Sequence, residues 1–314
     1  MDFLNKPFQI TPKIDVPDLG KGILAVQRFG EFVREVRENS AIIKDARVLN
    51  ALKSYEVDIS RISLGVELEP GRNTSGTKVA PTADEVTVST NTLEMKELVT
   101  KVVLEDEALE DNIEQSAFEQ TITSLLASGV TYDLECFFLH ADSSLTTGRE
   151  LYRINDGWMK LAGNQYTDAE PEDENWPLNL FDGMMDELDT RYLQLKPRMK
   201  FYVSNEIYNG YRKQLLVRET GLGDSALMGA TGLQYDGIPI QYVPALDALG
   251  DDKARALLTV PTNLVYGFWR NIRIEPKRDA AMRRTEYIAS LRADCNYEDE
   301  NAAVAAVIDM SSGG

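Results

Sequence analysis

The spacing of hydrophobic residues changes several times along the chain, and each change predicts a different element. Residues 1–20 are irregular and contain Pro7, Pro12 and Pro17, so they predict an extended N-terminal arm. After the arm, apolar side chains recur three or four positions apart, which is the period of one helix face. This helical set is Ile23, Val26, Phe29, Val33 and Val36.

A two-stranded ribbon is predicted between about residues 57 and 100. From Glu56 the apolar period becomes two, as in a strand, with the set Val57, Ile59, Ile62, Leu64, Val66 and Leu68. The change of phase between Ile59 and Ile62 predicts a bulge or a bend. The loop EPGRNTSGTKVAPTADE then leads to a second strand with Val86 and Val88. A lone ribbon is marginally stable in water, so we expect it to pack on a neighbouring subunit.

A long helix is predicted after an acidic stretch that has seven carboxylates and no Lys or Arg between residues 105 and 119. Its apolar ladder is Leu109, Ile113, Phe118, Ile122, Leu125, Leu126, Val130, Leu134, Phe137 and Phe138. Asp106 or Asp111 can cap free N–H groups at the positive end of the helix dipole. A helix from Asp111 to Ala141 would span roughly 46 Å at ~1.5 Å per residue. A metal cage or an acid–base pair is the less favoured interpretation, because residues 105–114 lack the glycine of a calcium loop.

The second half of the chain mixes strands and helices. The segment RMKFYVSN predicts a buried strand, and Asn205 is expected to cap the helix that follows. The segments LVYGFWRNIRIEP and RRTEYIASLRADCNYED predict antiparallel partners around the turn PKRDAAM. Alternation in the second segment places on one side Tyr287, Ala289, Leu291, Ala293 and Cys295. The final segment, AAVAAVID, is expected to close the sheet.

Length and composition are those of a globular chain of one large domain or two ordinary ones, with 314 residues, 43% of them hydrophobic and 27% charged. No apolar run approaches the ~18 residues of a membrane span, and MDFLNKPFQITPK lacks the pattern of a signal peptide.

Charge distinguishes this chain more than the rest of its composition does. The formal net charge of −18 argues against a protein whose main task is to bind phosphates. Nine acids and no Lys or Arg lie between Asp168 and Asp189, whereas residues 270–284 hold six basic residues and two acids. Such blocks are usually solvated faces, but they are also suited to contacts between copies of the chain.

Few residues are suited to catalysis. The single histidine, His140, is interpreted as a helix C-terminal residue that the negative end of the dipole favours. Cys136 and Cys295 are predicted to be buried thiols, as in a reducing compartment. One His and two distant Cys do not supply a zinc site, and no nucleophile elbow or phosphate loop is present. A hydrolase with paired carboxylates stays open, because any acid-rich chain offers such pairs.

Six segments, in order, resemble the major capsid proteins of tailed double-stranded DNA bacteriophages that share the HK97 fold. They are FGEFVREVRENSAIIKDARV, VDISRISLGVELEP, VTKVVLEDEALEDN with the helix ending DLECFFLHAD, KFYVSNEIYNGYRKQLLVRETGLGD, YDGIPIQYVPAL and NLVYGFWRNIRIEPKRD. The resemblance covers nearly the whole chain from about residue 20. Each segment matches loosely, and their common order carries the resemblance.

The resemblance implies an α+β fold with an N-terminal arm, an extended E-loop, a P-domain with a long spine helix, and an A-domain. The implied boundaries are 1–55 for the arm and first helix, 56–100 for the E-loop, 101–150 for the spine helix, 151–262 for the A-domain and 263–314 for the return strands. It also implies a protein that is not an enzyme and needs no cofactor or metal.

The function implied is that of a virion shell protein, assembled in the host bacterial cytoplasm. Hexamers and pentamers of the chain would form an icosahedral shell around double-stranded DNA, without sequence-specific binding and without a membrane. Portal, scaffolding and cement proteins are the further partners implied. The alternatives are an encapsulin-like nanocompartment and, more remotely, an acid-pair hydrolase.

Residues expected at contacts between subunits are Arg72, Lys78, Arg270, Arg273, Lys277, Arg278, Arg283 and Arg284. The net charge favours pairing of the basic run with carboxylates of adjacent copies, such as those between Asp168 and Asp189, over DNA binding. Some members of the family cross-link an E-loop lysine to an asparagine, for which Lys78 and Asn296 or Asn301 are candidates. Non-covalent contacts are the favoured interpretation, because the assisting glutamate has no clear counterpart.

Overall fold

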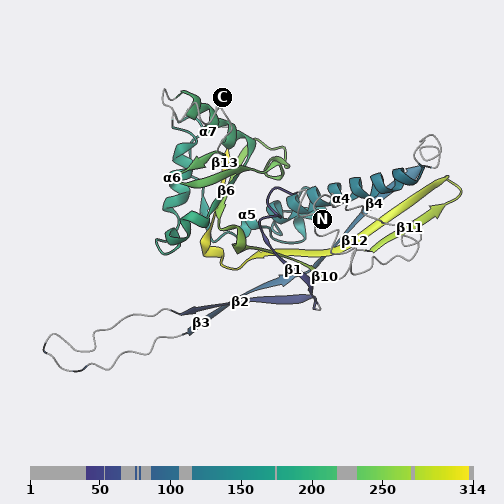
Figure 1. Cartoon of the computed structure of the whole chain (residues 1–314), viewed down its shortest axis with the longest axis horizontal. Coiled ribbons are helices and arrows are strands. Elements are labelled where there is room, and N and C mark those ends of the chain that lie inside the picture. Colours follow the sequence, from purple (N-terminus) through teal and green to yellow (C-terminus); the bar gives the residue numbers. More distant parts are fainter. Residues whose placement is uncertain are drawn as a thin grey trace, which may run out of the picture. The chain divides into compact units, whose positions relative to one another are not determined.

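The computed structural model describes residues 40–52, 54–64, 75, 78, 86–105, 115–173, 175–217, 232–269 and 273–310 (Figure 1). These residues belong to two compact units. One contains residues 97–131 and 270–292, and the other contains residues 40–96, 132–269 and 293–310. None of the helices that the structure describes is long and apolar enough to cross a membrane.

The first unit is built on strands that flank the early part of β12 (Arg284–Tyr297). β11 (Arg273–Asp279) pairs with it antiparallel, from Arg273 opposite Ser290 to Asp279 opposite Arg284. β4 (Lys96–Glu105) pairs with β12 as well. The predicted antiparallel partners around the turn are therefore confirmed.

A long helix, α4 (Gln115–His140), is unbroken over 26 residues. Its C-terminal part lies in the second unit, where Leu134, Phe137, Phe138 and Leu139 are buried. The predicted helix is confirmed over this range, and residues 106–114, with the proposed caps Asp106 and Asp111, lie outside the described residues.

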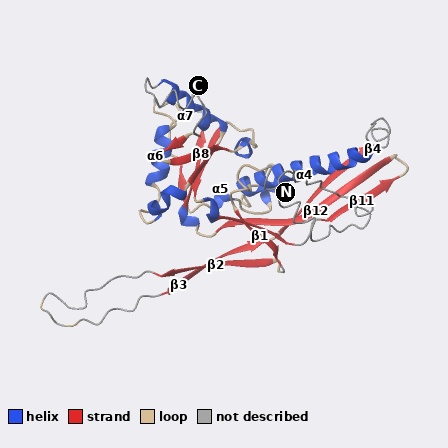
Figure 2. Cartoon of the chain, in the orientation of Figure 1, coloured by secondary structure: helices blue, strands red, loops and turns tan. Residues whose placement is uncertain are grey.

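The second unit contains a six-stranded sheet in the order β5-β13-β9-β6-β8-β7. Its strands are β5 (Asn164–Tyr166), β6 (Lys200–Val203), β7 (Gln234–Tyr235), β8 (Ile238–Tyr242), β9 (Lys253–Thr259) and β13 (Ala303–Asp309). Helices α6 (Leu178–Asp186) and α7 (Asn205–Val217) flank these strands (Figure 2). Both helices share one core with the sheet, in which Phe181, Phe201 and Ile207 are fully buried.

Shorter elements connect these parts of the second unit. They are α5 (Trp158–Leu161) and the 3₁₀ turns η1 (Glu150–Arg153), η2 (Tyr192–Arg198), η3 (Pro244–Asp247), η4 (Pro261–Asn263) and η5 (Glu300–Ala302). Beside them, β1 (Arg47–Leu52) pairs parallel with β10 (Leu264–Trp269), and β10 pairs antiparallel with the later part of β12.

Two expectations about strands are wrong. β13 does not close a sheet, because it lies between β5 and β9 as an internal strand. Its small side chains, from Ala303 to Ala306, are fully buried, as an internal strand covered on both faces requires. The bulge expected between Ile59 and Ile62 is also absent, since β2 and β3 stay in register there.

His140 occupies the predicted position at the end of α4, but the reason given for it is wrong. The side chain is 8% exposed, and its Nε2 lies 2.6 Å from the carbonyl oxygen of Ala245. Burial lowers the pKa of His140 to about 4. The imidazole is therefore neutral at pH 7, and it acts as a buried donor instead of a cation at the helix dipole.

Candidate assembly elements

The ribbon consists of β2 (Glu56–Leu64) and β3 (Val86–Glu94), which pair antiparallel from Glu56 opposite Glu94 to Leu64 opposite Val86. In Figure 1 this pair extends away from the other strands of its unit. A ribbon of two strands has too little apolar surface to be stable alone in water. Its stability therefore depends on the residues that hold its root, where Glu56 and Glu94 meet.

An apolar cluster holds one side of the root. Ile59, Leu93 and Met95 are buried together with Val265 of β10. The ring of Trp269 packs against this cluster and meets Tyr55 edge to face, with ring centroids 5.8 Å apart. Each buried side chain of this size contributes roughly 1.5–3 kcal/mol, so the root is fixed to the strand next to it.

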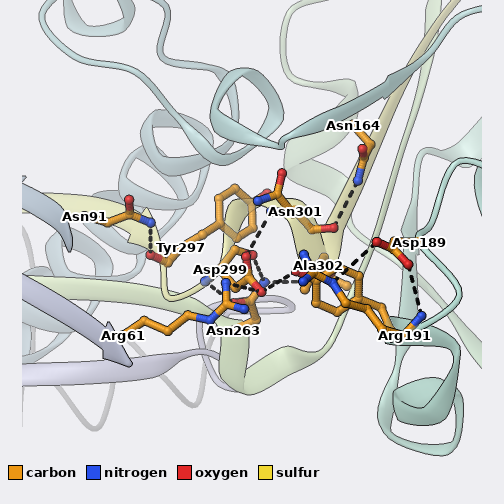
Figure 3. Close-up of polar contacts among 12 residues, drawn as sticks. Arg61, Asn91, Asn164, Asp189, Arg191, Asn263, Tyr297, Asp299, Asn301 and Ala302 are labelled. Atoms are coloured by element: carbon orange, nitrogen blue, oxygen red, sulfur yellow. Dashed lines mark hydrogen bonds and ion pairs between the residues drawn. The ribbon is translucent and has the colours of Figure 1, made fainter. Parts of the chain in front are cut away.

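Side-chain amides hold the ribbon from the other direction. Asn91 Nδ2 donates to the carbonyl oxygen of Tyr297 over 2.9 Å, as Figure 3 shows. Asn296 Nδ2 returns the contact by donating to the carbonyl oxygen of Thr92 over 3.0 Å. These two hydrogen bonds, each from a side-chain amide to a backbone carbonyl, join the ribbon to the end of β12.

Asp299 is the central acceptor of the polar network in Figure 3. Its carboxylate pairs with Arg61 of the ribbon at 2.5 Å and accepts from the hydroxyl of Tyr192 at 2.7 Å. Its backbone N–H donates to Asn263, and its carboxylate also accepts from the N–H of Asn301. Burial and then the hydrogen bond to Asp299 raise the pKa of Tyr192, so this phenol stays a donor at neutral pH. Asp299 thus links the ribbon, η2 and the turn before β13.

The segment that follows residue 39 is anchored as firmly. Glu135 of α4, 4% exposed, accepts from the hydroxyl of Ser40 at 2.6 Å and from the N–H of Ile42 at 2.8 Å. Asp45 pairs with Lys200 of β6 at 2.6 Å. These contacts attach the segment that begins at Ser40 directly to α4 and β6.

The end of β11 and the turn that leads to β12 carry predicted basic residues. Lys277, Arg278 and Arg283 are exposed, and Arg283 has a positive φ of 48°. Arg278 Nη1 lies within 3.4 Å of the hydroxyl of Thr285. Within the part of the chain that the structure describes, Arg283 forms no ion pair, so its charge is available to a partner.

Arg284 differs from its neighbour because it already has partners in its own chain. It lies 3.0 Å from Glu286 and 3.8 Å from Asp279. Lys101 of β4 pairs with the same Glu286 at 2.8 Å, and this hydrogen bond lowers the pKa of Glu286. Arg284 is therefore a less suitable contact residue than Arg283.

The other predicted contact residues are placed less completely. Lys78 is exposed, and Arg273 begins β11. Arg72 and Arg270 lie outside the described residues. Asn296 Nδ2 donates to the carbonyl oxygen of Thr92 at the root of the ribbon, and Asn301 lies within η5. A cross-link from Lys78 to either asparagine would join two subunits, so it stays a prediction.

The acidic stretch from Asp168 to Asp189 lies along the surface around α6. Its described carboxylates are all exposed. Among the described residues, Asp189 alone in this stretch forms an ion pair, with Arg191 at 3.5 Å. This surface therefore offers unpaired negative charge to a basic partner.

Sequence reasoning missed Glu135, Asp294 and Asp299. Each is a single acid in a chain with 51 acids, so its type alone gave no signal. Asp294 lies in the alternating strand on the side opposite Ala293 and Cys295, and the alternation gave no sign of its burial, although it is 3% exposed. Burial of an acid in such a strand is visible only when the neighbouring ribbon root is known.

Comparison with known proteins identifies this architecture. No protein-family model matches the chain. A Bacillus subtilis (strain 168) protein described as a prophage capsid protein, YqbE, is 28% identical over 292 residues, which are 90% of this chain and 91% of that protein.

Solved capsids share the fold at much lower identity. A chain of the satellite phage P4 procapsid matches with a TM-score of 0.59 and 15% identity, over 89% of this chain and 99% of that one. A capsid chain of a native GTA particle matches with a TM-score of 0.58 and 13% identity, over 98% and 96%. Mycobacterium phage Che8 gives a TM-score of 0.54 and 14% identity, over 99% and 98%. The chain has the HK97 capsid fold.

The predicted α+β HK97 fold is thereby confirmed. An HK97-fold chain accounts for a two-stranded ribbon whose root, at Ile59, Leu93 and Met95, joins the core. It also agrees with the prediction of a structural protein, because the relatives that match are capsid proteins.

Proposed function

We propose that the chain is a major capsid (head) protein of a tailed bacteriophage or prophage, and that its place is the virion. Copies form hexamers and pentamers that close into an icosahedral shell around double-stranded DNA. The observation that carries this proposal is the ribbon β2–β3, whose root is fixed while its strands run beyond its own unit's core. The prophage capsid relative, which covers 90% of the chain, supports the same conclusion.

The parts of the subunit take the roles that this fold assigns. The ribbon is the E-loop, α4 is the spine helix, and the six-stranded sheet with α6 and α7 forms the A-domain. The basic turn and the acidic surface around α6 are contact surfaces between copies. A portal protein, a scaffolding protein and cement proteins are the expected further partners.

Negative-stain imaging of the expressed protein, alone and with the assembly proteins of its phage, tests this function. We expect shells, hexamers or pentamers, and double-stranded DNA in particles that are formed during infection. A protein that stays monomeric under every condition would contradict the proposal. Particles that enclose an enzyme cargo and no DNA would instead indicate a nanocompartment.

A further inference from the structure

The contacts that hold the ribbon to its own unit differ in kind along its length. At the root they are apolar, because Ile59 and Leu93 pack with Val265 of β10. Two residues farther along β2, Arg61 forms an ion pair with Asp299, with 2.5 Å between the guanidinium Nη1 and the carboxylate Oδ2. The ribbon is therefore held by an apolar attachment and, farther from the root, by an ionic one.

Asp299 is held in place without help from Arg61. It precedes η5, and its carboxylate caps that turn by accepting from the N–H of Asn301. Its own N–H donates to the side chain of Asn263, and its carbonyl oxygen accepts from the same side chain, each over 2.8 Å. The acceptor is thus already in position when Arg61 binds, so the ion pair has to order only the arginine side chain.

A second cation supports the charge of Asp299 through a hydroxyl group. Arg191 Nη2 donates to the hydroxyl oxygen of Tyr192 over 2.8 Å, and that hydroxyl donates to Asp299 over 2.7 Å. Figure 3 shows Arg61 and Arg191 on opposite sides of Asp299. Because the carboxylate keeps the donors Tyr192 and Asn301 when Arg61 leaves, it is not stranded without a partner.

The two attachments differ in how easily they are exchanged for water. The side chain of Arg61 is 26% exposed, so its guanidinium can be solvated when the pair separates, and such a pair contributes little net free energy. Ile59 and Leu93 are buried, and exposing them costs free energy in proportion to their apolar area. The ion pair therefore opens before the apolar cluster does.

We propose that Arg61 and Asp299 form a detachable latch, and that the apolar cluster at the root is the hinge on which the ribbon turns when the latch opens. With the latch closed, the ribbon is fixed to the turn that leads into β13. With the latch open, the ribbon takes other angles to its unit. The latch belongs to the free subunit; its use in a shell rests on the proposed function, since an open latch lets one ribbon fit neighbours placed differently in hexamers and pentamers.

Distances between two spin labels, measured by pulsed electron paramagnetic resonance, test the latch in the free subunit. One label is attached at Ser63→Cys, two residues beyond Arg61 in β2, and the other at Lys213→Cys, an exposed position of α7. Cys136 and Cys295 are buried, so they should not take up label. We expect a narrow distance distribution with the native latch and a broad one in Arg61→Met, in which the ratio of latched to open molecules falls roughly fivefold.

Two further arginine variants separate the latch from a general effect of charge. Arg61→Lys keeps the cation and should keep a narrow distribution. Arg47→Met is the matched control, because Arg47 pairs with Glu298, the neighbour of Asp299, over 2.8 Å but belongs to β1 instead of the ribbon. It should leave the distribution unchanged. Equal broadening by Arg47→Met, or a distribution in Arg61→Met as narrow as that with the native latch, would overturn the proposal.

Salt tests the native latch directly, so the test stays decisive if Arg61→Met fails to fold. Between about 0.1 M and about 1 M salt, the Debye length falls from about 10 Å to about 3 Å. Screening should broaden the distribution with the native latch and leave that of Arg61→Met unchanged, and a salt-independent native latch would contradict the proposal. Normal shells from a subunit without a latch would reject the latch alone. A latched subunit that never assembles would reject the proposed function alone.

Discussion

His140 and Asp294 are buried titratable side chains whose pKa values are shifted so that each favours its neutral form. Burial lowers the pKa of His140 to about 4 from 6.5, and it raises that of Asp294 to about 7 from 3.8. Their effects on stability therefore have opposite signs with pH. In the wild type the two dependences partly cancel between about pH 4 and 6.5.

We expect His140→Phe to remove a stability loss at acid pH. Because the folded pKa of His140 is depressed, its unfolded form binds a proton first as the pH falls. Neutral His140 makes its full contribution to the free energy of unfolding above pH 6.5. As the pH falls towards 4, about 3 kcal/mol of this contribution is lost. Urea unfolding of the wild type and the variant at pH 7.5 and 4.5 measures it. Equal pH dependence in both proteins would show that His140 titrates normally.

For Asp294→Asn, the effect on stability should depend on pH in the opposite direction to that of His140→Phe. The folded pKa of Asp294 is raised, so its contribution is complete below pH 3.8 and is lost as the pH rises through about 7. The variant should therefore gain stability relative to the wild type at pH 8, by up to about 4 kcal/mol, and not at pH 4. The same urea titrations measure this difference, and a variant less stable than the wild type at pH 8 would contradict it.

Glu135 is a single residue whose removal should destabilise the fold, because it leaves buried donors without an acceptor. Glu135→Ala strands the hydroxyl of Ser40 and the N–H of Ile42. Each costs about 1–3 kcal/mol, so we expect destabilisation of about 3 kcal/mol. Ser40→Ala, the comparison, strands one donor in place of two, the N–H of Ile43 that donates to Ser40 Oγ over 2.9 Å, and should cost less. Thermal or urea unfolding checks both variants, and equal losses would refute the anchoring role.

At the scale of elements, the basic turn separates two arginines that look equivalent in the sequence. Arg283→Ala should weaken assembly of empty shells without altering subunit stability, because Arg283 has no ion pair among the described residues. Arg284→Ala should lower both the assembly of shells and the stability of the subunit, since it breaks contacts with Glu286 and Asp279. Assembly yield by sedimentation and unfolding of free subunits distinguish the two. Empty shells that form normally but fail only to package DNA would favour DNA binding instead.

The ribbon gives a second prediction at this scale. Deleting Gly71 to Pro81 should leave a folded subunit with normal helix content but poor shells, because the fixed contacts lie at the root. Circular dichroism and negative-stain imaging measure the two properties. If the subunit unfolds, the deleted segment belongs to a core, and the assignment of the ribbon fails.

Periodicity predicted these elements well where one face of an element is buried throughout. β12 has such a face, with Ala289, Leu291, Ala293 and Cys295 buried. The bulge was wrong because β2 and β3 keep one register from Glu56 to Leu64 although the apolar pattern changes phase. Ile59 is buried by contacts with Leu93, Met95 and Val265 that this pattern does not show. The position of β13 was equally hidden, since AAVAAVID fits an edge or an internal strand until its partners β5 and β9 are known.

The candidate site was less predictable than the fold. Basic residues at a turn were visible as a charge block, and Lys277, Arg278 and Arg283 are indeed exposed. Their partners were not visible, because pairing such as that of Arg284 with Glu286 depends on strand register. The root residues Asp294 and Asp299 depend on side chains from segments about 200 residues apart, which no local pattern encodes.

At the scale of the whole molecule, the shell should not depend on metal or on disulfides. Cys136 and Cys295 are free and buried. No group of three metal-ligating side chains exists among the described residues. We expect shells to survive both EDTA and reducing agents, as judged by sedimentation. Dissociation by EDTA alone would revive a metal site in the acidic stretch before α4.

The internal position of β13 has a consequence for synthesis. Its residues, Ala303–Asp309, are translated after those of β5 and β9, between which they insert. While the chain is still being made, β5 and β9 cannot complete their ladders, and the core that they share with α6 and α7 stays unfinished. Nascent chains crowded on one messenger RNA thus lack finished surfaces with which to join one another. The second unit can complete this core only after β13 has been translated, so the order of synthesis times the folding of the unit.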